Sequence, residues 1–211
     1  MFKLLPALHA GVLRSVRLFG LLVVTALAGC ATSYVDGTTK DVPSSAFRKP
    51  ASPQPVQLLF EFQTKGTLNT RVTDGLKAEV TQQIQSSGLF SSVVDKPVPG
   101  GALLSVTLNN VPLSDDAFRK GFVTGFTFGL VGSQVSDGYV CTVTYLTNAQ
   151  PAGVTKQARH AIHTTVGASS APPNSVKADS IGAAVHTMTR QIVSTTLNDL
   201  SQDSNFKQET P

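Results

Sequence analysis

The sequence predicts an α+β fold: a two-layer sandwich in which two helices pack on a mostly antiparallel sheet of four or five strands. Two observations support this prediction. First, one amphipathic helix pattern lies between two strand patterns, so these two strands do not form a hairpin with each other. Second, another helix pattern follows a hairpin rich in β-branched and aromatic residues. A layer of helices on one face of a sheet buries all of these apolar faces together.

The first strand and helix are marked by a change of hydrophobic period. "VQLLFEF" (56–62) alternates apolar and polar positions, which is typical of a half-buried strand. After Gly66 the apolar residues recur at every fourth position, which indicates a helix. They are Val72, Leu76, Val80 and Ile84. Gly88 is placed to end this helix as a left-handed cap, with Leu89 making the closing apolar contact.

Three further strands are expected. "ALLSVTLN" (102–109) follows a loop of proline and glycine and places its apolar residues on one face. "YVCTVTYLT" (139–147) is rich in β-branched and aromatic residues, which favour strands. "NAQPAG" then turns the chain into 154–166, the predicted hairpin partner of the preceding strand.

The second helix closes the predicted domain, residues 56–200. Its apolar residues recur at helical spacing. They are Ile181, Val185, Met188, Ile192 and Leu200. Asp179 or Ser180 can cap its N-terminus. The polar residues 201–211 are expected to form a disordered tail.

The first 29 residues predict a secretory signal peptide. Three basic residues precede a ten-residue apolar run, Leu18–Leu27, that is too short to span a bilayer. The run ends in "LAGC", which resembles the bacterial lipobox. This resemblance implies that Cys30 is lipidated and becomes the first residue of the mature chain. Ala31 stands where the inner-membrane retention signals of such lipoproteins carry aspartate, so the resemblance implies the outer membrane.

Removal of the signal peptide changes the overall charge. Its three basic residues leave 14 basic against 13 acidic side chains, a net charge of +1. This balance indicates no basic face for nucleic acid. If Cys30 carries lipid, Cys141 is the only thiol left, and an intramolecular disulfide is excluded.

The region that follows the anchor is expected to be a linker. Residues 31–55 hold four prolines and little apolar periodicity. Together with Cys30 they form the predicted lipidated N-terminus and flexible linker, 30–55. Fully extended, such a segment could reach about 80 Å. It would hold the domain clear of the membrane.

The order of elements carries a second resemblance. A strand, a helix ending "SSGLFSSVVD" (86–95) and another strand are similar to small envelope modules of the curli-secretion lipoprotein and TolB N-terminal type. The pattern also resembles the lipoprotein subunits that assist ABC transporters and lipopolysaccharide assembly. These families imply accessory roles in assembly or transport rather than catalysis.

Motifs of catalysis and cofactor binding were not found. "GLVGSQ" is not a G-x-S-x-G nucleophile elbow, and neither a P-loop nor a G-x-G-x-x-G pattern occurs. His160 and His163 would share a face on a helix, but on the predicted strand they point to opposite faces. His160 is expected on the mostly apolar face and His163 on the polar one, so no metal site is predicted. Cys141 is expected to be a buried thiol rather than a nucleophile.

The most unusual stretch is "GFVTGFTFGLVGS" (121–133). It has no charge and carries apolar residues among regularly spaced glycines. We consider it a candidate interaction segment, made of Gly121, Phe122, Gly125, Phe126, Phe128, Gly129 and Leu130. Three interpretations remain open: a buried element of the core, a seam with a partner or second copy, and a membrane hairpin formed with the strand at 139–147.

The predicted function is that of a lipid-anchored, non-catalytic binding or accessory subunit in outer-membrane assembly or transport. The expected partners are the membrane, through Cys30, and an envelope protein or a second copy of the chain. No cofactor, metal or nucleic acid is expected. The expected location is the outer membrane, with the domain facing the periplasm. The alternative is a self-assembling outer-membrane channel component that uses 121–147 as a hairpin.

Overall fold

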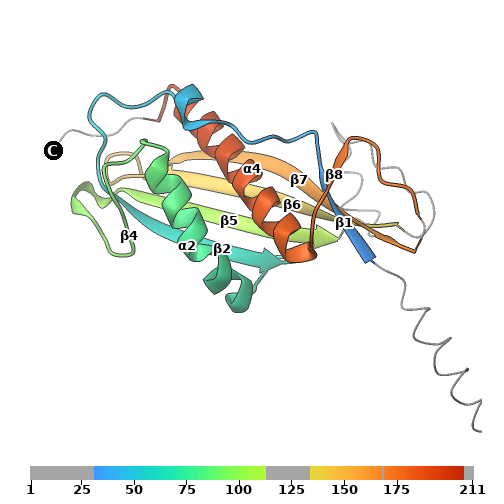
Figure 1. The fold of residues 1–211 in the computed structure, drawn as a ribbon. Helices are drawn as coiled ribbons and strands as arrows, with labels where there is room; N and C mark the ends of the chain where they lie inside the picture. The colour runs from blue at the N-terminus through green and yellow to red at the C-terminus, as the bar shows by residue number, and fades with distance from the viewer. Residues whose placement is uncertain (1–30, 113–133, 168, 207–211) are drawn as a thin grey trace, which may run out of the picture.

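Among the residues that the structure describes, two helices lie on one face of an eight-stranded sheet (Figure 1). The computed structural model describes residues 31–112, 134–167 and 169–206. The strand order is β3-β2-β5-β6-β7-β1-β8, with β4 paired to β2 outside this path. The α+β class is confirmed, whereas the expectation of four or five strands is wrong.

The four long strands are the predicted ones, and the additional strands have two to six residues. The strands are β1 (Ala31–Asp36), β2 (Val56–Thr64), β3 (Thr67–Leu68), β4 (Val93–Val94), β5 (Leu103–Pro112), β6 (Gln134–Leu146), β7 (Val154–Val166) and β8 (Ser175–Lys177). The helices are α2 (Thr70–Ser86) and α4 (Ile181–Gln202), and short 3-10 turns are formed by η1 (Ser44–Ala46) and η2 (Pro99–Gly101). β2 runs parallel to β4 and β5, and the other strand pairs are antiparallel.

Both helices begin and end close to the predicted positions. The side chain of Asn69 accepts a hydrogen bond from the N–H of Val72 at 3.2 Å and caps α2. Gly88, with φ of +71°, follows α2 in the left-handed conformation that glycine adopts without strain. Ser180, one of the two predicted caps of α4, accepts a hydrogen bond from the N–H of Ala183 at 3.0 Å.

The core lies between the helices and the facing side of the sheet. The alternating positions of the strand patterns are buried as expected. They are Val56, Leu58, Phe60 and Phe62 of β2, Leu104, Val106 and Leu108 of β5 with the preceding Ala102, and Tyr139, Cys141, Val143 and Tyr145 of β6. From the helices, Leu76, Val80, Ile84, Met188, Ile192 and Leu200 pack against them.

The region predicted as a flexible linker is part of the fold. β1 is paired on both sides, with β7 and with β8. The chain then runs along α4 (Figure 1), where Val42 and Arg48 donate backbone hydrogen bonds to serine hydroxyls of the helix at 3.0 and 3.1 Å. Phe47 is buried in the core. The linker prediction for 31–55 is therefore wrong, because the strand pairing that orders the segment is non-local.

The predicted tail is also ordered at its start. α4 continues to Gln202, and Ser201 is buried. The ring of Phe206 packs edge-on against Phe90 and Tyr145, with centroid distances of 6.1 and 5.0 Å. Within the described residues, the fold therefore includes 31–55 and 201–206 in addition to the predicted 56–200. Within the described ranges, neither helix is long and apolar enough to cross a membrane.

Candidate functional site

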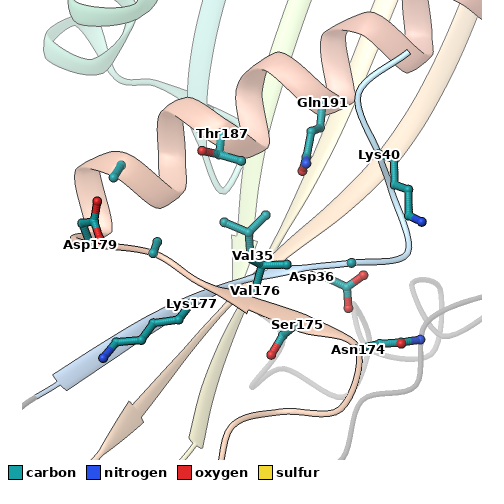
Figure 2. Close-up of a pocket in the computed structure, with 13 residues that line it drawn as sticks. Val35, Asp36, Lys40, Asn174, Ser175, Val176, Lys177, Asp179, Thr187 and Gln191 are labelled. Carbon is teal, nitrogen blue, oxygen red and sulfur yellow. The ribbon is translucent and has the colours of Figure 1, made fainter. Parts of the chain in front are cut away.

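A groove of about 560 Å³ lies between α4 and the last two strands of the sheet, β1 and the edge strand β8 (Figure 2). Val35 and Val176, which are register partners in the two strands, form its floor. Ala183, Thr187 and Gln191 line its wall at every fourth position of α4, which places them on one face of the helix. This volume falls within the range of natural small-ligand sites, about 300–1,000 Å³.

Charged and polar residues surround the apolar floor. They are Asp36, Lys40, Asn174, Ser175, Lys177 and Asp179. Figure 2 shows Thr187 and Gln191 pointing from the helix toward the strands, and Val35 and Val176 pointing toward the helix. The groove therefore combines an apolar base with polar groups of both charge signs.

The turn at one end of the groove depends on a glycine. The N–H of Gly37 donates to the carbonyl of Asn174 at 2.6 Å. A Cβ at position 37 would lie 2.5 Å from that oxygen, so only glycine allows this close approach. Asn174 itself has φ of +54°, a left-handed conformation that asparagine tolerates better than most residues. Together these residues hold the end of β1 against the start of β8.

His160 lies behind the groove and orients Gln191. Its Nδ1 accepts a hydrogen bond from the N–H of Ala161 at 2.8 Å, so the proton of the neutral ring sits on Nε2. Nε2 donates to Oε1 of Gln191 at 2.7 Å. Burial lowers the pKa of His160, which keeps the ring neutral. Because Oε1 accepts from the histidine, the amide of this groove-lining residue keeps its NH₂ group as a donor for another molecule.

Asp36 connects the rim of the groove to a second buried histidine. His163 Nε2 lies 3.4 Å from Asp36 Oδ2, and His163 Nδ1 lies 2.8 Å from the hydroxyl of Ser136. The N–H of Thr38 donates to Asp36 Oδ1 at 2.8 Å, and the Thr38 hydroxyl donates to the same oxygen. Burial alone would raise the pKa of Asp36, but these hydrogen bonds from His163 and Thr38 hold it below its usual value.

Ser136, His163 and Asp36 are the residue types of a hydrolytic triad, but their setting is that of a structural network. The exposed fractions are 8, 2 and 5 %, respectively. A nucleophile needs space for the substrate carbonyl beside its oxygen. The three residues come from the neighbouring strands β6, β7 and β1, and they share one face of the sheet. We therefore interpret them as cross-strand hydrogen bonds that fix β1 in register.

The two histidines do point to opposite faces of β7, as the strand pattern predicts, because one contacts Gln191 of α4 and the other Ser136 and Asp36. His163 has polar partners, as expected for that face, and it is also buried, with an exposed fraction of 2 %. Over the described residues, no group of three or more His, Cys, Asp or Glu side chains is placed to hold a metal ion.

Cys141 is buried in the core, as predicted. Its surroundings raise the pKa of its thiol to about 12, chiefly through burial, against a weaker lowering by a hydrogen bond with Thr196. A thiol with this pKa carries almost no thiolate near neutral pH, so it does not act as a nucleophile.

The remaining predicted site residues lie outside the described residues. These are Cys30, Gly121, Phe122, Gly125, Phe126, Phe128, Gly129 and Leu130. The structure does bear on the membrane hairpin proposed for 121–147. β6, which contains the second half of that hairpin, pairs with β5 and β7 in the middle of the sheet and faces the core. The prediction that 139–147 forms the second half of a membrane hairpin is therefore wrong, because this strand is already paired with β5 and β7.

Sequence reasoning missed Asp36, Ser136 and Gln191. Asp36 falls in the segment interpreted as a linker, and Ser136 precedes the strand that the pattern delimits at 139. Gln191 belongs to a predicted helix, but nothing local shows that it meets His160. The spacing Ala183, Thr187 and Gln191, which places small and polar residues on one face of a helix, is the only local signal for the groove.

Comparisons with known proteins identify no family for the chain. No family model matches it, and no curated protein matches it by sequence. Among solved structures it is similar to the PelC dodecamer from Paraburkholderia phytofirmans, with 11 % identity and a TM-score of 0.36, covering 83 % of this chain and 100 % of that one. It is also similar to a DUF330 protein from Xanthomonas campestris, with 11 % identity and a TM-score of 0.36, covering 77 % of this chain and 87 % of that one. These similarities are too weak to assign a family or to transfer a function.

Proposed function

We propose that the protein is a lipid-anchored component of the cell envelope that acts by binding rather than by catalysis. The anchor is supported by the signal-like N-terminus and by "LAGC", which places Cys30 directly before the first strand. The binding role is supported by one observation above all. The groove presents an oriented amide, Gln191, over an apolar floor, while the buried Ser136–His163–Asp36 network offers no open nucleophile.

The chemistry of the groove defines the kind of ligand that it would take. Gln191 offers N–H donors. Lys40 and Lys177 make no ion pair with the residues that the structure describes. A fitting ligand has hydrogen-bond acceptors along an apolar body, as an extended peptide segment or an acyl chain with a polar head does. On this basis the domain would hold part of a partner or cargo close to the membrane.

The anchor is tested by the intact mass and membrane fractionation of the full-length protein. We expect the mature chain to start at residue 30, to carry acyl chains and to float with membranes. Cys30→Ser should abolish all three properties. A mature chain without lipid on residue 30 would contradict the anchor.

The groove is tested by photo-crosslinking in intact cells. A photoreactive residue at position 187 should give a discrete adduct that weakens at least severalfold on Gln191→Leu. The same residue at position 59, on the open face of β2, serves as the control. Equal crosslinking from both positions, or none from position 187, would argue against the groove. The mass of the 31–211 chain in solution then separates self-association from binding of another molecule.

A further inference from the structure

We propose that the end of the domain at which β1 begins lies directly on the lipid surface, with Val135, Val166 and Ile181 in contact with the headgroup region. The inference rests on the proposed lipid anchor and adds to it an orientation and a contact surface. It commits to a lipid surface, because the attachment point leaves no length of chain by which the domain could stand away from the membrane.

Ala31 lies directly after the proposed attachment point. This residue is already in β1 and is the register partner of Val166, the last residue of β7. Consecutive Cα atoms are about 3.8 Å apart across a trans peptide. A lipid on residue 30 is therefore one peptide bond from a strand that is paired on both sides. The reach of about 80 Å that a 25-residue linker would supply is absent.

Several helix and strand ends meet at the end of the molecule where β1 begins. β7 ends there, and β6 begins there, since Gln134 is the partner of Thr165. α4 begins nearby, because the N–H of Ala178, shortly before the helix, donates to the carbonyl of Ser33 in β1 at 2.9 Å. Figure 1 shows the start of β1 and the start of α4 at the same side of the fold. We call this region the anchor end.

Three large aliphatic side chains of the elements at the anchor end are exposed. Val166, opposite Ala31, has an exposed fraction of 45 %. Val135 of β6 and Ile181 at the start of α4 are 57 and 53 % exposed. Single exposed aliphatic side chains are ordinary on soluble proteins. Here, however, all three lie on elements that meet at the anchor end. An interfacial element sinks about 5–10 Å into the boundary between headgroups and acyl chains. The short connection would bring these side chains to that depth.

The opposite end of the sheet provides the matched control. Val94 of β4 is also a partly exposed aliphatic residue, at 37 %, but β4 pairs with the first residues of β2. β2 runs parallel to β5, whose last residues are partners of the first half of β6. The start of β2, and Val94 with it, therefore lies at the end of the sheet away from Ala31. A strand of nine residues such as β2 spans about 30 Å, so the two ends are easily resolved by a depth measurement.

The experiment measures depth in the full-length lipidated protein on vesicles of zwitterionic phospholipid. Val166→Cys and Val94→Cys are each labelled with an environment-sensitive fluorophore, and quenching by spin-labelled lipid is recorded. Cys141 stays unlabelled in the folded state because it is buried. We expect quenching at position 166 to exceed that at position 94 at least threefold. A third protein carries 20 Gly/Ser residues inserted between residues 30 and 31. Its linker would span about 25 Å on average, so quenching at 166 should fall at least twofold.

The outcomes separate this inference from the anchor itself. Equal quenching at the two positions of a lipidated, vesicle-bound protein would overturn the orientation and leave the anchor intact. Unchanged quenching at position 166 after the insertion would show that the connection does not set the orientation, and would also overturn the inference. A protein whose mass shows no acyl chain and which does not bind vesicles would overturn the anchor and, with it, the orientation.

Discussion

His163 Nε2 lies 3.4 Å from Asp36 Oδ2, across 127 residues of sequence. The contact joins β7 to β1 on the face of the sheet that points away from α4, since His160, three residues earlier on the strand, points toward the helix. It places an ionised carboxylate in a buried position, where a charge is tolerated only when hydrogen bonds satisfy it. The N-terminal strand is thus held by polar contacts on one face and by Val35 in the core on the other.

We expect Asp36→Asn to destabilise the fold by about 1–3 kcal/mol at pH 7, because it removes a charge-assisted hydrogen bond from a buried site. The pKa of Asp36 is lowered on folding, so its stabilising contribution is present above the ordinary aspartate value, about 3.9, and is lost as the pH falls through the lower folded value. The difference in unfolding free energy between wild type and Asp36→Asn, measured by urea unfolding, should therefore decrease below about pH 4.

Asp41→Asn is the matched control. Asp41 also lies in the N-terminal segment and also pairs with a distant residue, Arg190, at 2.7 Å, but both side chains are about half exposed. We expect a change of about 0–1 kcal/mol. Equal effects of the two substitutions would mean that the Asp36–His163 contact contributes no more than a surface ion pair.

The pH dependence of stability near neutrality should depend on His160. Burial lowers its pKa in the folded protein, so below about pH 6.5 the unfolded chain binds a proton that the folded chain does not bind. Stability should therefore fall as the pH decreases below this value. His160→Gln removes that titration, and the slope of unfolding free energy against pH between 7 and 5 should decrease by up to about 1.4 kcal/mol per pH unit.

His186→Gln is the control for this slope. His186 of α4 lies beside Glu79 of α2, with more than half of its side chain exposed. Its replacement should leave most of the slope in place. A slope that is the same in wild type and His160→Gln would mean that the buried ring titrates normally in the folded protein.

The predictable part of this fold is the part with local periodicity. β2, β5, β6 and β7 each carry alternation over seven residues or more, and α2 carries a stripe at helical spacing with a cap at Gly88. These signals depend only on neighbouring residues. β1 and β8 have six and three residues. They form because β1 pairs with β7 and β8 in turn pairs with β1. A short polar segment with prolines nearby gives no local sign of such a partner.

The candidate site was less predictable for the same reason. The groove is built from β1, β8 and α4, and the polar contacts behind it join residues 127 and 31 positions apart. The sequence did indicate that His160 and His163 lie on opposite faces of one strand. It could not indicate that Gln191 and Asp36 would meet them, because those contacts arise only when the layers pack.

Cys141 should not react with thiol reagents in the native protein. Its thiol is fully buried and its pKa is raised to about 12, so both access and thiolate formation are suppressed. In the 31–211 chain, labelling by a disulfide reagent at pH 8 should be slow and should become complete in 8 M urea. The exposed variant Val135→Cys is the positive control and should react at once. Rapid labelling of Cys141 under native conditions would show that the interface between β6 and α4 opens readily.

The order of the N-terminal segment is the strongest departure from the sequence prediction, and proline substitution tests it. Tyr34 is paired with His163 of β7 and with Lys177 of β8. A proline there removes an N–H from a strand that is paired on both sides, so we expect Tyr34→Pro to destabilise the 31–211 chain by about 2–4 kcal/mol in urea unfolding. Tyr34→Ala removes the same ring but keeps the N–H, and should cost at least 1 kcal/mol less. Ala51 is exposed and lies shortly before β2, after the segment that runs along α4. Ala51→Pro should therefore change stability by about 0.5 kcal/mol or less. If 31–55 were a flexible linker, all three substitutions would have equally small effects. If β1 lies inside the sheet, Tyr34→Pro should destabilise the protein most and Ala51→Pro least.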